Sequence, residues 1–161
     1  MVKNSQLGVA YTGAGISTGA GICDYASANA PKNKLANNQF RQAIPTKAHF
    51  VIAEMMKKDI MANWLQQNHD GLAQKAGCPL YKLNEIHGSW YDKSNPVVKM
   101  NGSLKTENFE SMNDWIQLQD LCIAVGSSLV GMNSDNMVRE GIDKFRESNG
   151  QMHRGVCIIN N

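Results

Sequence analysis

The chain has 161 residues, which is enough for one domain with a buried core. Its formal net charge is only +2, and no run of lysine or arginine forms a basic patch, so composition gives no indication of nucleic-acid binding. No apolar run is long enough to span a bilayer, and the N-terminal residues do not resemble a signal peptide. We therefore expect an intracellular protein, cytoplasmic or nuclear, without membrane contact.

Short apolar runs alternate with helix-compatible segments along the chain. The pattern predicts strands within residues 7–12, 60–68, 79–88, 95–100, 121–128 and 155–161. It predicts helices over residues 46–59, 114–121 and 136–148, and an Asn-rich loop over residues 26–38. Apolar strands that alternate with helices indicate an α/β fold, a Rossmann-like parallel sheet with helices on both faces.

Two of the predicted helices are amphipathic. The first follows Pro45 and has Thr46 as its cap. Its apolar positions at helical spacing are Ala48, Val51, Ile52, Met55 and Met56. The last helix is expected to direct four apolar side chains toward the core, those of Met137, Val138, Ile142 and Phe145.

The four cysteines are far apart in the sequence and include no C-x-x-C pair, so neither a zinc ribbon nor a thioredoxin-type motif is indicated. Cys122 and Cys157 lie inside apolar runs, where we expect buried free thiols rather than disulfides. The histidines show no H-x-x-x-H pair. We therefore expect no metal site.

Three polar clusters follow predicted strands. TGAGIS (residues 12–17) follows the first, QQNHDG (residues 66–71) the second, and GSS (residues 126–128) a later one. The carboxyl ends of parallel strands meet at one edge of a sheet, which is where such sheets bind ligands. We therefore expect the three clusters to converge.

The glycine-rich segment after the first strand has two interpretations. Gly13 and Gly15 could let backbone N–H groups approach a pyrophosphate at the positive end of a helix. The spacing G-x-G-x-x-x-G departs from the strict G-x-G-x-x-G fingerprint, so a purely structural turn explains it equally well. No acidic residue about twenty positions further on ends a second strand, which disfavours hydride transfer.

The other polar residues are open to similar alternatives. Asp70 within QNHDG can cap a turn, and the GSS segment can form an ordinary turn or contact a ribose or phosphate. His87 ends a predicted strand and precedes Gly88. It is either a structural histidine or a general base that works near neutral pH.

Six segments together resemble, in their residue patterns and in their order along the chain, the sirtuins. These are NAD-dependent protein deacylases of the silent-information-regulator type. TGAGIS…GICDY is similar to the family's TGAGIS…GIPDF cofactor loop, and PTKAHFVIAEM to its PN-x-x-H-x-x-L helix. QQNHDGLAQKAG resembles TQN-x-DGLH-x-x-AG, EIHG resembles ELHG, AVGSSLVGM resembles GTSL-x-V-x-P, and CIIN resembles a strand whose Asn meets the adenosine ribose. The resemblance implies a single NAD-binding catalytic domain over residues 1–161.

The resemblance also implies the roles of individual residues. Those around NAD would be Gly13, Ala14, Gly15, Ser17, Asp24, Tyr25, Gln67, Asn68, Asp70, Gly126, Ser127, Ser128 and Asn160. The catalytic residues would be His87, as general base, and Asn68. An acyl-lysine peptide would be held as an added strand by Val97, Val98, Lys99 and Met100.

The sequence departs from the family's pattern in several places. Only residues 89–95 stand where the family carries a four-cysteine zinc module, so we expect no zinc, a small domain that is absent or much reduced, and a short linker instead. Cys23 replaces a proline, and Ala26 replaces an arginine that contacts NAD. His69 replaces an apolar residue of the nicotinamide pocket.

On this resemblance we predict a minimal sirtuin that acts as an NAD-dependent protein-lysine deacylase, with O-acyl-ADP-ribose and nicotinamide as products. Two alternatives stay open. One is an NAD glycohydrolase or ADP-ribosyltransferase on the same fold, because NAD hydrolysis needs no docked peptide. The other is a catalytically weak NAD- or ADP-ribose-binding module, which the presence of Asn68, Asp70 and His87 together disfavours.

Overall fold

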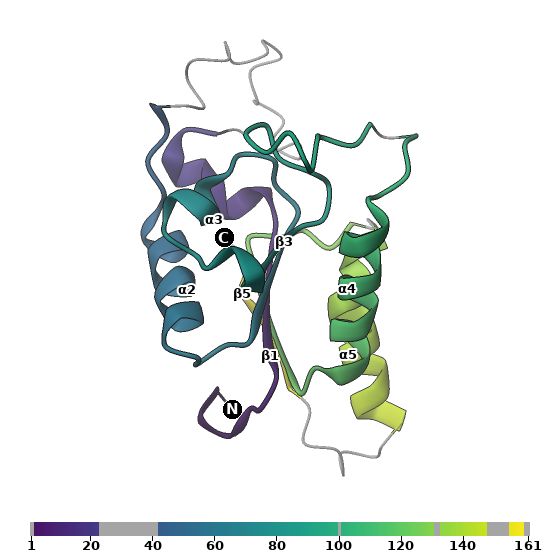
Figure 1. Ribbon diagram of the computed structural model, residues 1–161. Helices are drawn as coiled ribbons and strands as arrows, with labels where there is room; N and C mark the ends of the chain where they lie inside the picture. Colours follow the sequence, from purple (N-terminus) through teal and green to yellow (C-terminus); the bar gives the residue numbers. More distant parts are fainter. Residues whose placement is uncertain (1, 23–41, 100, 131–132, 148–154, 160–161) are drawn as a thin grey trace.

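Five parallel strands form a single sheet in the computed structural model, which describes residues 2–22, 42–99, 101–130, 133–147 and 155–159 (Figure 1). The strands are β1 (Gly8–Thr12), β2 (Asn63–Gln66), β3 (Leu83–Glu85), β4 (Leu121–Val125) and β5 (Gly155–Ile159). Their order across the sheet is β3-β2-β1-β4-β5. The chain extends the sheet from β1 to one side and then to the other, so the strand order reverses between β1 and β4.

Helices cover both faces of this sheet. On one face lie α2 (Lys47–Lys57) and the short α3 (Leu72–Lys75), and on the other lie α4 (Thr106–Leu118) and α5 (Asn136–Glu147) (Figure 1). Among the described residues, no helix is both long enough and apolar enough to cross a membrane. The predicted fold class, a Rossmann-like parallel sheet with helices on both faces, is confirmed.

Short 3₁₀ turns connect several of these elements. They are η1 (Val2–Asn4), η2 (Ala14–Ala20), η3 (Leu80–Lys82) and η4 (Asn133–Asp135). Two of them, η2 and η4, follow the carboxyl ends of β1 and β4, so they lie at the edge where the predicted polar clusters are expected.

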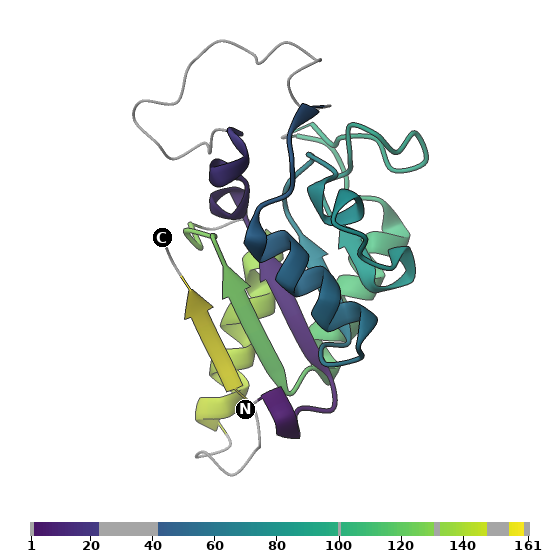
Figure 2. The same ribbon diagram turned by 90° about the vertical axis from the view of Figure 1, so that its left-hand side faces the viewer.

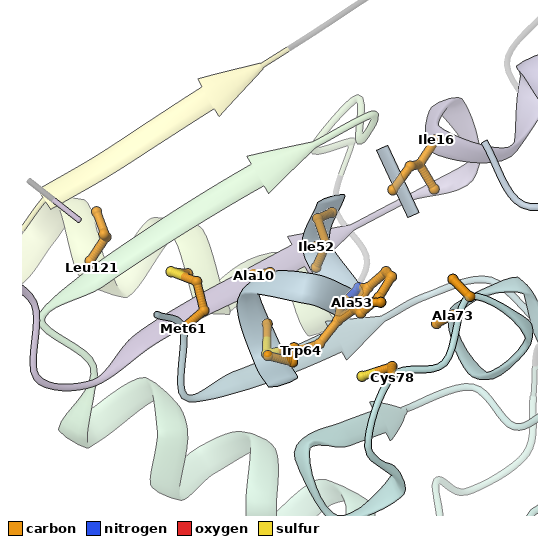
Figure 3. Close-up of a cluster of buried hydrophobic side chains, with 11 residues drawn as sticks. Ala10, Ile16, Ile52, Ala53, Met61, Trp64, Ala73, Cys78 and Leu121 are labelled. Carbon is orange, nitrogen blue, oxygen red and sulfur yellow. The ribbon is translucent and has the colours of Figure 1, made fainter. Parts of the chain in front are cut away.

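The core on the α2 face centres on Trp64. This side chain is fully buried, and its indole N–H donates to Thr12 Oγ1 at 2.8 Å. Trp64 pairs with Ala10 across β1 and β2, and cross-strand partners face the same side of a sheet. Figure 3 shows the resulting cluster, which also contains Ile16, Ile52, Ala53, Met56, Met61, Ala73, Ala76, Cys78 and Leu121.

The alternate strand residues face α4 and α5. Val9 and Tyr11 of β1 pack there with Leu65, Ile86, Met112, Ile116, Cys122, Ala124, Met137 and Val138. Both faces of the central strands are covered, and β4 is apolar at every position. In the core on this face, Tyr11 brings a hydroxyl group among apolar side chains.

Helix α2 begins where the sequence predicts. Thr46 is its N-cap, and the Thr46 N–H donates to His49 Nδ1 at 3.2 Å in a capping box. Val51, one of the apolar positions at helical spacing, does not belong to the buried face, because its side chain is 58% exposed. The buried face is formed by His49, Ile52, Ala53 and Met56.

Two other expected elements differ in length or kind. Helix α4 begins at Thr106, well before the predicted start at residue 114. The prediction missed its first turns because they are polar: only Met112 and Ile116 are buried in this helix. The strand predicted over residues 95–100 is wrong for its described part, 95–99. There Pro96 has no N–H to donate to a ladder. The Val98 N–H donates to the carbonyl of His87, beyond the end of β3, and no strand forms.

The two cysteines that were expected to be buried differ in exposure, because one lies at the centre of the sheet and the other at its edge. Cys122, in β4, is buried as a free thiol, as predicted. Cys157 is also a free thiol but is exposed, so its predicted burial is wrong. It lies on the edge strand β5, on the opposite face from α5, and within the described part of the chain no helix covers β5 there (Figure 2).

The two neighbouring positions on α2 allow a matched test of the core. Replacing the buried side chain (Ile52→Ala) should lower the free energy of unfolding by about 2–5 kcal/mol, because it leaves a cavity against the sheet. Replacing its exposed neighbour (Val51→Ala) should change it by no more than about 0.5 kcal/mol. Urea unfolding measures both, and equal losses would contradict the orientation of α2.

Candidate functional site

The loops that follow β1 and β4 contact each other backbone to backbone. The Gly13 N–H donates to the Val125 carbonyl at 3.2 Å, and the Gly15 N–H to the Gly126 carbonyl at 2.8 Å. Gly126 has a φ of 63°, and a Cβ atom on it would lie 2.4 Å from the Ile16 nitrogen. Only glycine satisfies both conditions at this position.

This contact changes the interpretation of the glycine-rich segment. A Cβ atom would lie 2.9 Å from the β4 loop if added to Gly13, and 2.8 Å from it if added to Gly15. Their own N–H groups donate to carbonyls of the protein, as in the interpretation of this segment as a structural turn. The two glycines let the loops approach, and the groups that could meet a ligand are the side chains around them.

Polar side chains from the β1 and β2 loops form one hydrogen-bonded group. Ser17 Oγ donates to Asp70 Oδ2 at 2.6 Å, and Asn68 Nδ2 donates to Ser17 Oγ at 3.0 Å and to the Gly13 carbonyl at 3.1 Å. Asp70 Oδ1 accepts the Leu72 N–H at 2.9 Å, so Asp70 forms the expected turn as well. The predicted convergence of the TGAGIS and QNHDG segments is therefore confirmed.

His87 lies at the same edge, two residues after β3, and is half-buried. Its Nδ1 is 3.2 Å from the Gln67 carbonyl, and because a carbonyl can only accept, Nδ1 carries the proton. Nε2 is then the basic nitrogen. Burial lowers the pKa of His87, the hydrogen bond to Gln67 raises it, and nearby His69 lowers it. The ring is therefore neutral near pH 7, which is the form that a general base needs.

His69 lies beside both His87 and Trp90. Its Nδ1 donates to the Gly88 carbonyl at 3.0 Å, and its ring centroid is 6.2 Å from that of His87 and 5.8 Å from that of Trp90. The Trp90 N–H donates to the His69 carbonyl at 3.0 Å. A second imidazole thus lies beside the candidate base.

Residues 89–95 form a closed loop on β3. The Ser89 N–H donates to the Asn95 carbonyl at 2.8 Å, and Asn95 Nδ2 donates to the Glu85 carbonyl at 2.9 Å. Gly88 has a φ of 85°, and a Cβ atom there would lie 2.2 Å from the Pro96 oxygen. The chain therefore leaves β3 and returns to it within this short segment.

The residues predicted to hold a peptide follow directly. The Val98 N–H donates to the His87 carbonyl at 3.0 Å. Val97 is 37% exposed and Lys99 is also exposed, while Met100 lies outside the described residues. An exposed segment therefore passes beside the candidate base.

A second polar group, which the sequence pattern does not reveal, lies under Gln67. The Tyr11 hydroxyl donates to Asp135 Oδ1 at 2.5 Å. Gln67 Nε2 donates to Ser134 Oγ at 2.9 Å, to Asp135 Oδ1 at 3.2 Å and to the Tyr11 hydroxyl. Burial, and then the bond to Asp135, raises the pKa of Tyr11, so the phenol keeps its proton. The available signal was one tyrosine in an otherwise apolar strand.

The remaining predicted cofactor residues are only partly described. Ala14 begins η2, Ser127 is buried with its Oγ accepting the Leu129 N–H at 3.3 Å, and Ser128 is exposed. The Gly126 N–H donates to the Ile159 carbonyl at 3.0 Å, which brings the end of β5 to the same edge. Outside the described residues lie Cys23, Asp24, Tyr25, Ala26 and Asn160.

The arrangement suits proton transfer from a hydroxyl group. In the described part of the chain, no three His, Cys, Asp or Glu side chains are grouped to hold a metal ion. The edge instead offers amide side chains that can orient a hydroxylated ligand, and a neutral imidazole that can take a proton from it.

Comparison with known proteins connects these features to one family. The Sir2 family pattern matches residues 30–95. Human NAD-dependent protein deacetylase sirtuin-7 is 34% identical over 96 residues, which cover 56% of this chain and only 24% of that protein. NAD-dependent protein deacetylase 2 of Caldanaerobacter subterraneus is 28% identical over 189 aligned positions, which cover 81% of this chain and 74% of that protein.

Solved structures share the fold over nearly the whole chain. Sir2Tm bound to a propionylated peptide has a TM-score of 0.78 at 22% identity, covering 99% of this chain and 83% of that one. Sir2 with a p53 peptide and NAD⁺ has a TM-score of 0.76 at the same identity and coverage. The family match and the aligned relatives show that this chain is similar to the sirtuin, or Sir2, family, and the solved structures share its fold.

Proposed function

We propose that this chain is an NAD-dependent protein-lysine deacylase that releases nicotinamide and O-acyl-ADP-ribose. The observation that carries the proposal is the position of His87. Its Nδ1 is bound to the Gln67 carbonyl, which leaves Nε2 as a base at the same edge of the sheet as the group formed by Ser17, Asn68 and Asp70. Similarity to relatives that are named NAD-dependent protein deacetylases supports it.

The residues at this edge fit NAD. Ribose hydroxyls can donate to acceptors without net charge, and Gln67 and Asn68 offer such acceptors, their amide oxygens, from half-buried positions. The edge also lies where the strand order reverses, which is where such sheets bind nucleotides. When bound, NAD would supply the ribosyl carbon to which the acyl oxygen is transferred as nicotinamide leaves.

The chain's own residues would position and deprotonate a ribose hydroxyl. Asn68 is held by two hydrogen bonds, to Ser17 and to the Gly13 carbonyl, so its orientation is set before a ligand arrives. His87 Nε2 would accept the hydroxyl proton. The resulting imidazolium keeps its Nδ1–H on the Gln67 carbonyl, which stabilises the charge.

The acyl-lysine substrate would lie along residues 97–99. The Val98 N–H is bound to the His87 carbonyl, so this exposed segment is held directly beside the base. Related structures contain a propionylated peptide or a p53 peptide. We propose a peptide of this kind as the partner.

The first test follows nicotinamide release from NAD with and without an acetyl-lysine peptide. Release should require the peptide and fall by at least about a hundredfold in His87→Ala, because the base is lost. NAD affinity and the circular dichroism spectrum of the variant serve as folding controls. Release without peptide would instead indicate a glycohydrolase, and NAD binding without any release would indicate a binding module; both contradict the proposal.

The second test uses the pH dependence of kcat/KM. Burial lowers the pKa of His87, so the neutral base persists below the ordinary histidine pKa of about 6.5, and the acid limb should lie below that pH. Because His69 lowers the same pKa, His69→Ala should move the acid limb to higher pH. An unchanged limb, or a move to lower pH, would count against this account.

The third test concerns metal. We propose a zinc-free form in which residues 89–95 stand in place of the zinc module, since no cysteine lies between Cys78 and Cys122. Elemental analysis of the purified protein should find no stoichiometric zinc, and a chelator should leave both unfolding and activity unchanged. Zinc at one equivalent would refute this part of the proposal.

A further inference from the structure

Two buried residues have no part in the proposed chemistry, yet they hold a residue that does. Tyr11 is 0% exposed and Asp135 is 1% exposed. A carboxylate this deeply buried is costly unless its oxygens accept hydrogen bonds. Asp135 Oδ1 accepts one from the Tyr11 hydroxyl at 2.5 Å and one from Gln67 Nε2 at 3.2 Å. The pair therefore acts on the side chain of Gln67.

The chemistry of these partners determines which way round the Gln67 amide lies. A carboxylate can only accept, so the amide atom beside Asp135 must be the NH₂ group. The Tyr11 proton is donated to Asp135, so the phenol oxygen also accepts from Gln67, as does Ser134 Oγ at 2.9 Å. With Nε2 held among three acceptors, the amide can offer a ligand only its oxygen, Oε1.

The backbone of Gln67 connects this orientation to the candidate base. The Gln67 N–H donates to the Thr12 carbonyl at 3.0 Å, and the Gln67 carbonyl accepts from His87 Nδ1 at 3.2 Å. One residue is thus bound through its side chain to Tyr11 and Asp135, and through its main chain to His87. A displaced side chain would also disturb the residue that sets the tautomer of the base.

Charge provides a second link between Asp135 and His87. Two titratable groups face the His87 ring, His69 from the loop after β2 and Asp135 from η4. The negative charge of Asp135 raises the pKa of His87 and opposes the effects of burial and of His69. Asp135 therefore stabilises the imidazolium that forms when His87 takes a proton.

We propose that Tyr11 and Asp135 are positioning residues that fix the Gln67 amide with its oxygen toward a ribose hydroxyl of NAD, beside His87. This inference rests on the proposed function for the identity of the ligand. The hydrogen-bonded contact itself concerns only residues of the chain, so it can be tested without turnover.

The orientation is tested with Tyr11→Phe and with a charge exchange at the contact. Tyr11→Phe should raise the Kd for NAD about threefold to tenfold, because Gln67 loses one of its acceptors. Gln67→Glu places a second carboxylate against Asp135 and should raise the Kd by about tenfold or more. The double variant Gln67→Glu/Asp135→Asn should recover most of that loss, because the asparagine amide can donate where the carboxylate could not.

Matched controls separate this role from general damage. Tyr81→Phe and Asp143→Asn make the same chemical changes at exposed positions and should leave the Kd unchanged. Thermal unfolding verifies that each variant is folded. If Tyr11→Phe does not fold, the charge exchange alone decides. Wild-type affinity in Tyr11→Phe, or a double variant no better than Gln67→Glu, would overturn the proposal.

Nuclear magnetic resonance of the protein without NAD distinguishes this inference from the proposed function. The Gln67 amide protons should exchange faster in Tyr11→Phe, and the pKa of His87 should fall in Asp135→Asn, because the stabilising charge is lost. A wild-type protein that binds no NAD would refute the proposed function, and these spectra would still decide the contact. Unchanged exchange and an unchanged His87 titration would overturn the positioning role.

Discussion

The candidate site depends on a close contact between two loop backbones, residues 13–16 after β1 and Gly126 after β4. Neither loop could approach so closely with a side chain at this contact, because a Cβ on Gly126 would lie 2.4 Å from the Ile16 nitrogen. The contact places η2 over the edge of the sheet. Ser17, in η2, can then donate a hydrogen bond to Asp70, which lies in the loop after β2. The glycines thus act through the packing of the two loops, and a ligand would meet the side chains that this packing brings together.

Around this contact the polar groups divide into a buried set and a half-buried set. Buried polar atoms need partners, and here they bind one another: Ser17 binds Asp70, and Tyr11 binds Asp135. Of the half-buried side chains, Asn68 binds the first pair and Gln67 binds the second. His87 binds the Gln67 carbonyl. Since their partners are internal, their orientation is set before a ligand binds, which lowers the cost of ordering them during binding and catalysis.

Much of the fold could be predicted from the sequence because its signals are local. The apolar run of β1, the capping threonine of α2 and the alternation of strands with helices each depend on neighbouring residues. The errors came from contacts that no local pattern records. Val51 and Cys157 are apolar and exposed, because one lies on the outer side of a helix and the other on the uncovered face of an edge strand. Residues 95–99 are strand-like in composition, yet they form no strand.

The sequence by itself determined the resemblance to one family, the parallel α/β architecture and the residues that gather at one edge, because short motifs in a fixed order carry that information. Only the tertiary structure decided what those residues do to one another. It showed that the N–H groups of Gly13 and Gly15 are used between loops, and that the Gln67 carbonyl sets the tautomer of His87. It also showed that Tyr11 and Asp135, far apart in the chain, form a hydrogen bond in which the Tyr11 hydroxyl donates to the Asp135 carboxylate. A hydrogen bond depends on distance and direction in space, and residues this far apart in sequence acquire both only when the sheet has formed.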